Sequence, residues 1–87
     1  MNSVRNLLSY ILENIVDHPE DILITDESEE GITRFNVTLN DADYPRVIGR
    51  QGYTIKALTD ILRLYDVKQN ESSSSKIYIN ITAGQKE

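Results

Sequence analysis

The chain has 87 residues, of which 39% are hydrophobic and 26% charged, and it contains no cysteine. This composition fits one small globular domain and excludes disulfide bonds and thiolate metal sites. No stretch reaches the ~20 apolar residues that a membrane-spanning helix needs. Because Arg5, Glu13 and Asp17 interrupt the apolar residues of the first twenty positions, we expect no secretory signal, no membrane association and a cytoplasmic location.

The formal net charge of −5 argues against a nucleic-acid partner, because contacts to phosphate need cations. The charges are unevenly distributed along the chain, however. Residues 44–63 hold Arg46, Arg50, Lys56 and Arg63 against Asp60 alone, a local net charge of +3 that leaves −8 for the rest. We therefore expect any nucleic-acid contact within this window.

The first half of the chain predicts a helix followed by a β-hairpin. Residues 3–16 (SVRNLLSYILENIV) have the i, i+3, i+4, i+7 apolar spacing of an amphipathic helix, which Pro19 is expected to end. Residues 21–28 predict a short strand, and residues 32–40 predict a second strand with alternating apolar and polar side chains. Between them, Gly31 can take the positive φ of a tight turn.

The second half predicts two helices and a third strand. Asp41 or Asp43 can cap a short helix with Pro45 in its first turn, and a longer helix is expected over residues 53–66. Residues 67–75 are polar and serine-rich, as in a loop, and residues 76–82 (KIYINIT) alternate like a strand. The predicted order is α-β-β-α-α-β: a single α+β domain over residues 1–83, with a tail at 84–87. Its three-stranded mixed sheet would carry the helices on one face.

The element VIGRQG, residues 47–52, uses half of the four glycines of the chain between two predicted helices. Glycine takes unusual φ angles at little cost and, lacking a Cβ, lets a phosphate approach the backbone. The amides and dipole at the start of the following helix favour an anion, and Arg50 and Gln51 can donate to phosphate oxygens. No Walker A lysine follows the glycines. A plain tight turn between two helices is the alternative interpretation.

The nine residues V-I-G-R-Q-G-Y-T-I resemble the KH-domain signature V-I-G-x-x-G-x-x-I, whose GXXG loop clamps a nucleic-acid backbone. The element order resembles the type II, or prokaryotic, KH fold. HPED after the first helix and VIGRQGYTIKAL resemble the small bacterial KH proteins of the KhpA (YlqC-like) family. This resemblance covers nearly the whole chain. It implies single-stranded RNA binding, a role as RNA chaperone or post-transcriptional regulator, and in some bacteria a link to cell shape and cell division.

The resemblance also implies which residues contact RNA. Residues 49–52 match the GXXG loop, and residues 66–75 match a variable loop that flanks the groove. The apolar signature positions line the groove for bases or belong to the core. The expected RNA-binding residues are Gly49, Arg50, Gln51, Gly52, Arg46, Val47, Ile48, Tyr53, Ile55 and Lys56.

The helix predicted over residues 53–66 has an unusually wide apolar arc, of about 200°. Its core stripe is expected to comprise Ile55, Leu58, Ile61, Leu62 and Tyr65. Its solvent-exposed face is expected to comprise Lys56, Thr59, Asp60 and Arg63. Tyr53, Ala57 and Leu64 flank Ile61 and widen the arc. Either the helix is deeply buried, or Tyr53, Ala57, Ile61 and Leu64 form an interface. The resemblance implies as partners a second copy or a larger KH protein of the KhpB (Jag, EloR) type.

No metal site, cofactor, small-molecule substrate or active site is predicted. DESEE and Gly31 begin like a calcium loop, but Val37 stands where the bidentate acid is required. His18 is the only histidine, and no Ser-His-Asp set can be assembled, so we assign it no metal or catalytic role. We expect a binding protein rather than an enzyme. The alternative function is a KH-fold protein-interaction module with weak or no nucleic-acid binding.

Overall fold

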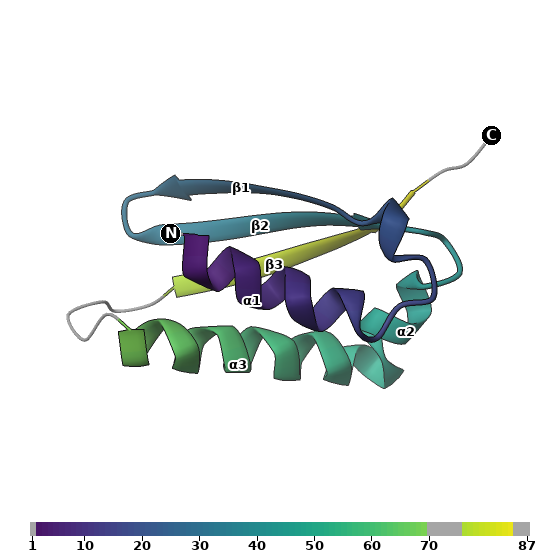
Figure 1. Ribbon diagram of the computed structural model, residues 1–87. Coiled ribbons are helices and arrows are strands. Elements are labelled where there is room, and N and C mark those ends of the chain that lie inside the picture. The colour runs from purple at the N-terminus through teal and green to yellow at the C-terminus, as the bar shows by residue number, and fades with distance from the viewer. Residues whose placement is uncertain (1, 70–75, 85–87) are drawn as a thin grey trace.

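The computed structural model describes residues 2–69 and 76–84, which form three helices and three strands (Figure 1). In chain order the elements are α1 (Asn2–Glu13), β1 (Leu23–Glu29), β2 (Ile32–Leu39), α2 (Tyr44–Ile48), α3 (Tyr53–Gln69) and β3 (Lys76–Ala83), with 3-10 turns at Pro19–Asp21 and Arg50–Gly52. This order confirms the predicted α-β-β-α-α-β arrangement and the α+β class.

The sheet has the strand order β1-β2-β3, with β1 antiparallel and β3 parallel to β2. Glu30 and Gly31 join β1 to β2 with φ angles of 53° and 82°. Two successive positive φ angles are typical of the two-residue turn that matches the twist of a hairpin. The connection from β2 to β3 passes through α2 and α3, and α1 and α3 lie side by side against one face of the sheet (Figure 1).

The core lies between these helices and the sheet. Phe35 and Val37 of β2 are fully buried because alternate residues of a central strand point toward the helices. The other fully or nearly fully buried apolar residues are Val4, Leu8, Leu12, Ile24, Leu39, Val47, Leu58, Leu62, Ile77 and Ile81. Those of α1 follow the predicted apolar stripe. The opposite face of the sheet carries polar and aromatic side chains, including a half-exposed Tyr78.

Several element boundaries differ from the predictions for local reasons. α1 ends at Glu13, not at residue 16. The N–H groups of Asn14 and Ile15 bond three residues back, and the Asn14 amide donates to the Tyr10 carbonyl at 2.7 Å. The helix thus tightens and caps itself before Pro19 is reached. β1 begins at Leu23 because Pro19–Asp21 forms a 3-10 turn.

α3 continues to Gln69, three residues beyond its predicted end, so residues 66–69 are helical and not part of a variable loop. Asp66 is buried, and residues 66–69 contain neither glycine nor proline, so nothing interrupts the helix there. The rest of the expected variable loop, residues 70–75, lies outside the described residues. At the start of the expected tail, the Gly84 N–H donates to the Leu39 carbonyl at 2.6 Å, which continues the pairing of the strands. Residues 85–87 also lie outside the described range.

Within the described ranges, 2–69 and 76–84, no helix combines the length and the apolar character that crossing a lipid bilayer requires.

Candidate nucleic-acid interface

The turn between α2 and α3 is built from backbone conformations that few residues adopt. Gly49 has φ 78° and ψ 174°, and Gly52 has φ 79°. Between them, Gln51 has φ 55° and ψ 25°, a left-handed conformation that costs a non-glycine residue roughly 1–3 kcal/mol. The Gly52 N–H donates to the Gly49 carbonyl at 3.1 Å and closes the turn. The two glycines therefore permit a turn that presents the residues 50 and 51 at its tip.

Gly49 is required by space as well as by backbone angle. A Cβ added to Gly49 would overlap Thr54 Oγ1 and would lie 2.7 Å from Thr54 Cβ and 2.8 Å from the Thr54 backbone nitrogen. Real Cβ atoms do not approach a backbone atom this closely. At Gly52 the nearest atom to such a Cβ is Ile55 Cγ2, at 4.0 Å. The first glycine thus allows α3 to pack against the end of α2, whereas the second is needed only for its φ angle.

A buried carboxylate fixes α2 against the end of the α1 segment. Asp43 occupies the N-cap position of α2 but makes no capping hydrogen bond. Its two carboxylate oxygens instead accept the backbone N–H groups of Asp17 and His18, both at 3.0 Å, and the residue is 1% exposed. The sequence allowed Asp43 as a cap; the structure shows that it ties together segments about 25 residues apart.

The basic residues of the window 44–63 differ in what they contact. Among the described residues, Arg50 has no ion pair or hydrogen bond, and it is exposed. Arg46 donates to the Ile15 carbonyl at 3.2 Å and pairs with Asp17 at 3.4 Å. Lys56 lies 3.6 Å from Asp60, one turn along α3. The positive charge at the turn is therefore concentrated on Arg50, with Arg46 and Lys56 partly neutralised.

Arg63 does not belong to this group, although the charge count of the sequence included it. Its Nε and Nη2 atoms both donate to the Ile77 carbonyl, at 3.1 and 2.9 Å, and its guanidinium lies 5.3 Å from the centre of the Tyr78 ring. The prediction that Arg63 lies on the solvent-exposed face of the helix is wrong, because its side chain forms hydrogen bonds with the outer edge of β3. Sequence periodicity offers no signal for such a contact, which depends on where the sheet edge lies.

The apolar signature residues lie at different depths. Val47 is completely buried, so its side chain supports α2 from within the core and offers no surface to a ligand. Ile48 and Ile55 are half-buried beside the glycine turn and pack partly against the core. Tyr53 is 63% exposed at the first position of α3. Of the ten residues predicted to bind RNA, all except Val47 thus have accessible surface around the turn.

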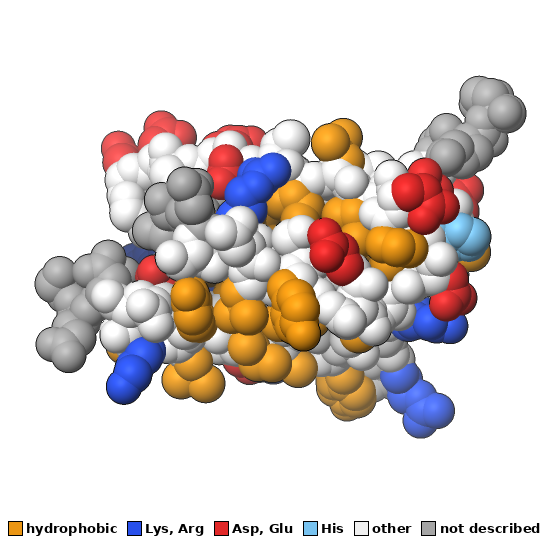
Figure 2. Space-filling model, in the orientation of Figure 1, with side chains coloured by type: hydrophobic (Ala, Val, Ile, Leu, Met, Phe, Trp, Pro, Cys, Tyr) orange, Lys and Arg blue, Asp and Glu red, His pale blue; other side chains and the backbone are white. Residues whose placement is uncertain are grey.

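α3 exposes an apolar stripe on the side away from the sheet. Leu64 is 72% and Ile61 47% exposed, and Ala57 and Tyr53 are exposed on the same side of the helix. The prediction that Ile61 is a core residue is wrong, and so is the deeply buried alternative for this helix. Figure 2 shows hydrophobic side chains gathered over the α1 and α3 part of the surface. The four residues at positions 53, 57, 61 and 64 are called the α3 face below.

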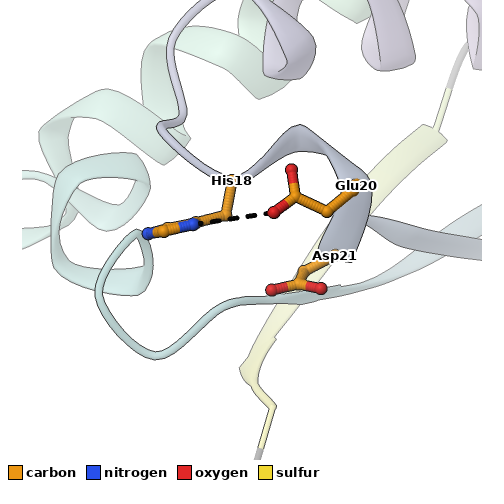
Figure 3. Close-up of side chains that lie close together, drawn as sticks. All are labelled: His18, Glu20 and Asp21. Atoms are coloured by element: carbon orange, nitrogen blue, oxygen red, sulfur yellow. Dashed lines mark ion pairs between the residues drawn. The ribbon is translucent and has the colours of Figure 1, made fainter.

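His18 has acidic neighbours that the sequence prediction did not consider. His18, Glu20 and Asp21 each bring one possible metal-ligand atom within 4.8 Å of the others (Figure 3). His18 Nδ1 lies 3.7 Å from Glu20 Oε2, and Asp21 accepts the Asn40 amide at 2.9 Å. The Asn40–Asp21 hydrogen bond links the 3-10 turn after α1 to the chain that leads into α2.

The sequence matches known proteins over most of its length. The family model described as "KhpA/KhpB, KH domain" matches residues 5–77. A relative from Thermotoga maritima named "RNA-binding protein KhpA" is 39% identical over 59 residues, which cover 68% of this chain and 79% of the relative. A protein of the same name from Chlamydia caviae is 30% identical over 74 residues, 85% of this chain and 95% of the relative. No solved structure matches the chain significantly. With its fold and its glycine turn, the chain therefore belongs to the KhpA/KhpB family of KH-domain proteins, which are not enzymes.

Proposed function

We propose that this protein binds single-stranded RNA through the GXXG loop at residues 49–52. The main support is Arg50, an exposed cation without a protein partner among the described residues, at the tip of a loop whose backbone is held in left-handed conformations. In a chain with a net charge of −5, such a residue is well suited to an anionic ligand. The relatives named RNA-binding proteins give the second line of support.

In this proposal the loop holds the RNA backbone and the neighbouring apolar surface holds bases. Arg50 and Gln51 donate to phosphate oxygens, and the absence of a Cβ on Gly52 lets the RNA backbone come close. Ile48 and Ile55 border a groove for about four bases, as in other KH modules. The exposed ring of Tyr53 can stack on a base. Arg46 and Lys56 add long-range attraction, which salt weakens.

The test is fluorescence anisotropy of a labelled short RNA pool at low and moderate salt. We expect wild type to bind and Arg50→Asp/Gln51→Asp to bind at least about tenfold more weakly, because the variant places two anions where phosphate would lie. Lys68→Asp/Gln69→Asp makes the same chemical change at the exposed end of α3 and serves as the matched control. Circular dichroism establishes that each variant is folded. No binding by wild type, or equal losses in both variants, would contradict the proposal.

We infer in addition that the α3 face associates with another KH domain of this family, either a second copy or the larger KhpB type. The exposed side chains of Ile61 and Leu64 favour burial against an apolar partner, and Ala57, one turn before Ile61, allows the close approach of a second helix. A dimer would place two weak RNA sites on one particle and so raise the apparent affinity through effective concentration.

Sedimentation analysis tests this association. We expect wild type to dimerise and Leu64→Glu to remain monomeric at the same concentration, because the new charge would have to be buried. Leu23→Glu makes the same change on a 61% exposed leucine of β1 and should leave dimerisation intact. If wild type is monomeric alone and with a KhpB-type KH domain, the inference fails.

A protein-interaction module with little RNA affinity is the second candidate function. It is favoured by the net charge of −8 outside residues 44–63 and by the exposed α3 face. Association through this face in a protein that shows no RNA binding at low salt would select this candidate. For the RNA-binding function, we propose that the protein acts in the bacterial cytoplasm as an RNA chaperone or post-transcriptional regulator. An effect on cell shape and division would follow from misregulated transcripts, and a loss-of-function strain complemented with Arg50→Asp/Gln51→Asp tests this link.

A further inference from the structure

β1 is an edge strand whose outer side is mostly open. Glu29 and Ile32 flank the two-residue turn and therefore form a hydrogen-bonded pair. Because hydrogen-bonded and non-bonded pairs alternate in an antiparallel ladder, Ile24, Asp26 and Ser28 direct their backbone groups away from β2. The Ile24 carbonyl accepts Arg5 Nη2 of α1 at 2.6 Å. Among the described residues, no other hydrogen bond reaches this outer edge, so the backbone groups of Asp26 and Ser28 are available.

This open edge is strongly acidic. Between Leu23 and Glu30 the chain carries Asp26, Glu27, Glu29 and Glu30 and no basic residue. Arg5 lies 3.8 Å from Asp26, and no ion pair reaches the three glutamates from the described residues. Figure 2 shows a row of acidic side chains at the hairpin end of the molecule, opposite α2 in Figure 1, and further acidic side chains around the histidine at the other end. The charge of this strand is therefore opposite to that of the glycine turn at the other end.

Two hollows lie along β1, one on each face of the sheet. On the α1 side, a hollow of about 270 Å³ is lined by Arg5, Ser9 and Glu13 together with Pro19, Leu23 and Ile24. On the open face, a hollow of about 290 Å³ near the turn is lined by Glu27, Glu29, Glu30, Ile32 and Arg34. A strand added to β1 would direct successive side chains alternately to the two faces. The edge thus offers side-chain hollows on both sides of an added strand.

We propose that the outer edge of β1 binds an extended, basic peptide segment of another protein by strand addition. Backbone groups of the segment pair with those of Asp26 and Ser28. Its lysine or arginine side chains enter the acidic hollow on the open face, and its smaller side chains point toward the mixed polar and apolar hollow beside α1. The stretch from Ile24 to Glu29 accommodates a segment of about six residues.

The charge of the edge argues for this occupant over others. A second copy of β1 would set its own acids against those of the first, and like charges opposite one another are destabilising. RNA would be repelled by the same four carboxylates. The alternative explanation is that the acidic residues only protect the sheet edge from aggregation. If that is their only role, a basic peptide will not bind to the edge.

The experiment measures fluorescence anisotropy of a labelled peptide of about seven residues that alternates valine and lysine. We expect wild type to bind it at least about tenfold more tightly than Glu27→Lys/Glu29→Lys does. Glu20→Lys/Asp41→Lys makes the same charge change at exposed positions away from the edge and should retain most of the affinity. No binding by wild type, or equal loss in the two variants, overturns the proposal.

A second pair of variants distinguishes strand addition from charge attraction alone. Ser28→Pro removes an outward N–H without altering charge or the β1–β2 ladder, since proline is tolerated at an outward-facing position of an edge strand. We expect it to lose binding at least about tenfold, whereas Ser28→Ala keeps the amide and the affinity. Binding to Ser28→Pro as tight as to wild type overturns strand addition. An N-methylated form of the peptide, with the same charge but fewer donors, should likewise fail to bind wild type.

Discussion

The carboxylate of Asp43 accepts the backbone N–H of His18 at 3.0 Å and, through its other oxygen, that of Asp17 at the same distance. These hydrogen bonds connect the start of α2 with the segment that follows α1. Since α2 leads directly into the glycine turn, a buried acid remote from the loop helps to set the position of Arg50. Both carboxylate oxygens of Asp43 are thus used as acceptors for backbone N–H groups.

Replacement of Asp43 should therefore destabilise the protein strongly. We expect Asp43→Ala to lower the free energy of unfolding by about 2–4 kcal/mol, because two partly buried amides lose a charged acceptor. Asp43→Asn should also destabilise, since its amide group faces one of the two donors. Urea denaturation measures both changes. Asp41→Ala removes an exposed neighbouring carboxylate and should change stability by less than about 0.5 kcal/mol. Similar losses at positions 41 and 43 would show that the two hydrogen bonds contribute little.

The two glycines of the turn should respond differently to substitution. Gly49→Ala would hold alanine at an unfavourable backbone angle and bring its Cβ into a clash with the Thr54 backbone. We therefore expect the free energy of unfolding to fall by more than about 3 kcal/mol, or the variant not to fold. Gly52→Ala causes only the unfavourable backbone angle, so we expect the free energy of unfolding to fall by about 1–2 kcal/mol. Thermal unfolding of the two variants under one condition compares them. If Gly52→Ala were the more damaging, the assigned role of Thr54 would be wrong.

Gln51 offers a substitution that should separate stability from ligand binding. Gln51→Gly relieves the left-handed strain at φ 55°, and we expect the free energy of unfolding to rise by about 0.5–1 kcal/mol after the entropy cost of glycine. The same variant lacks a side-chain donor, so the proposed RNA affinity should fall. Denaturant titration and RNA anisotropy on one preparation measure the two effects. An unchanged or lowered stability would mean that Gln51 is not strained in solution.

Arg63 should stabilise the edge of β3 in a way that lysine cannot reproduce. Its two donors share the Ile77 carbonyl, and its planar group lies over Tyr78. We expect Arg63→Ala to cost about 1–2 kcal/mol and Arg63→Lys to recover only part of that loss. The comparison variant is Arg34→Ala, which removes an exposed arginine of β2 that has no ion pair among the described residues. Full recovery with lysine would indicate that charge alone matters.

Local sequence patterns were sufficient for the order of the elements. The alternation in β2, the apolar spacing of α1 and the paired glycines each depend on residues close together in the chain, where backbone geometry fixes which side chains share a face. Element ends were less predictable: α1 stops before Pro19 because Asn14 caps it, and α3 passes through residues that looked like a loop. Helix ends depend on particular hydrogen bonds that periodicity does not report.

The candidate site was predictable to the same limited degree. The motif located the glycine turn and Arg50, because the conformation of a short turn is set by residues that are adjacent in the sequence. It could not separate Val47, which is fully buried, from the accessible Ile48, since both are apolar and neighbours in one short helix. Helical spacing also could not show whether Ile61 faces the core or the solvent. The apolar arc of the helix is wider than the surface that the sheet buries, so some of its residues stay exposed.

By itself, the sequence determined the KH-like order of helices and strands, the position of the GXXG turn and the concentration of positive charge near it. Only the tertiary structure decided that Asp43 anchors α2, that Arg63 closes the β3 edge and that the α3 face and the β1 edge stay open. The physical reason is that each of these depends on contacts, or on their absence, between segments far apart in the chain. Such contacts arise when the sheet and the helices pack together, and no local pattern of residues encodes them.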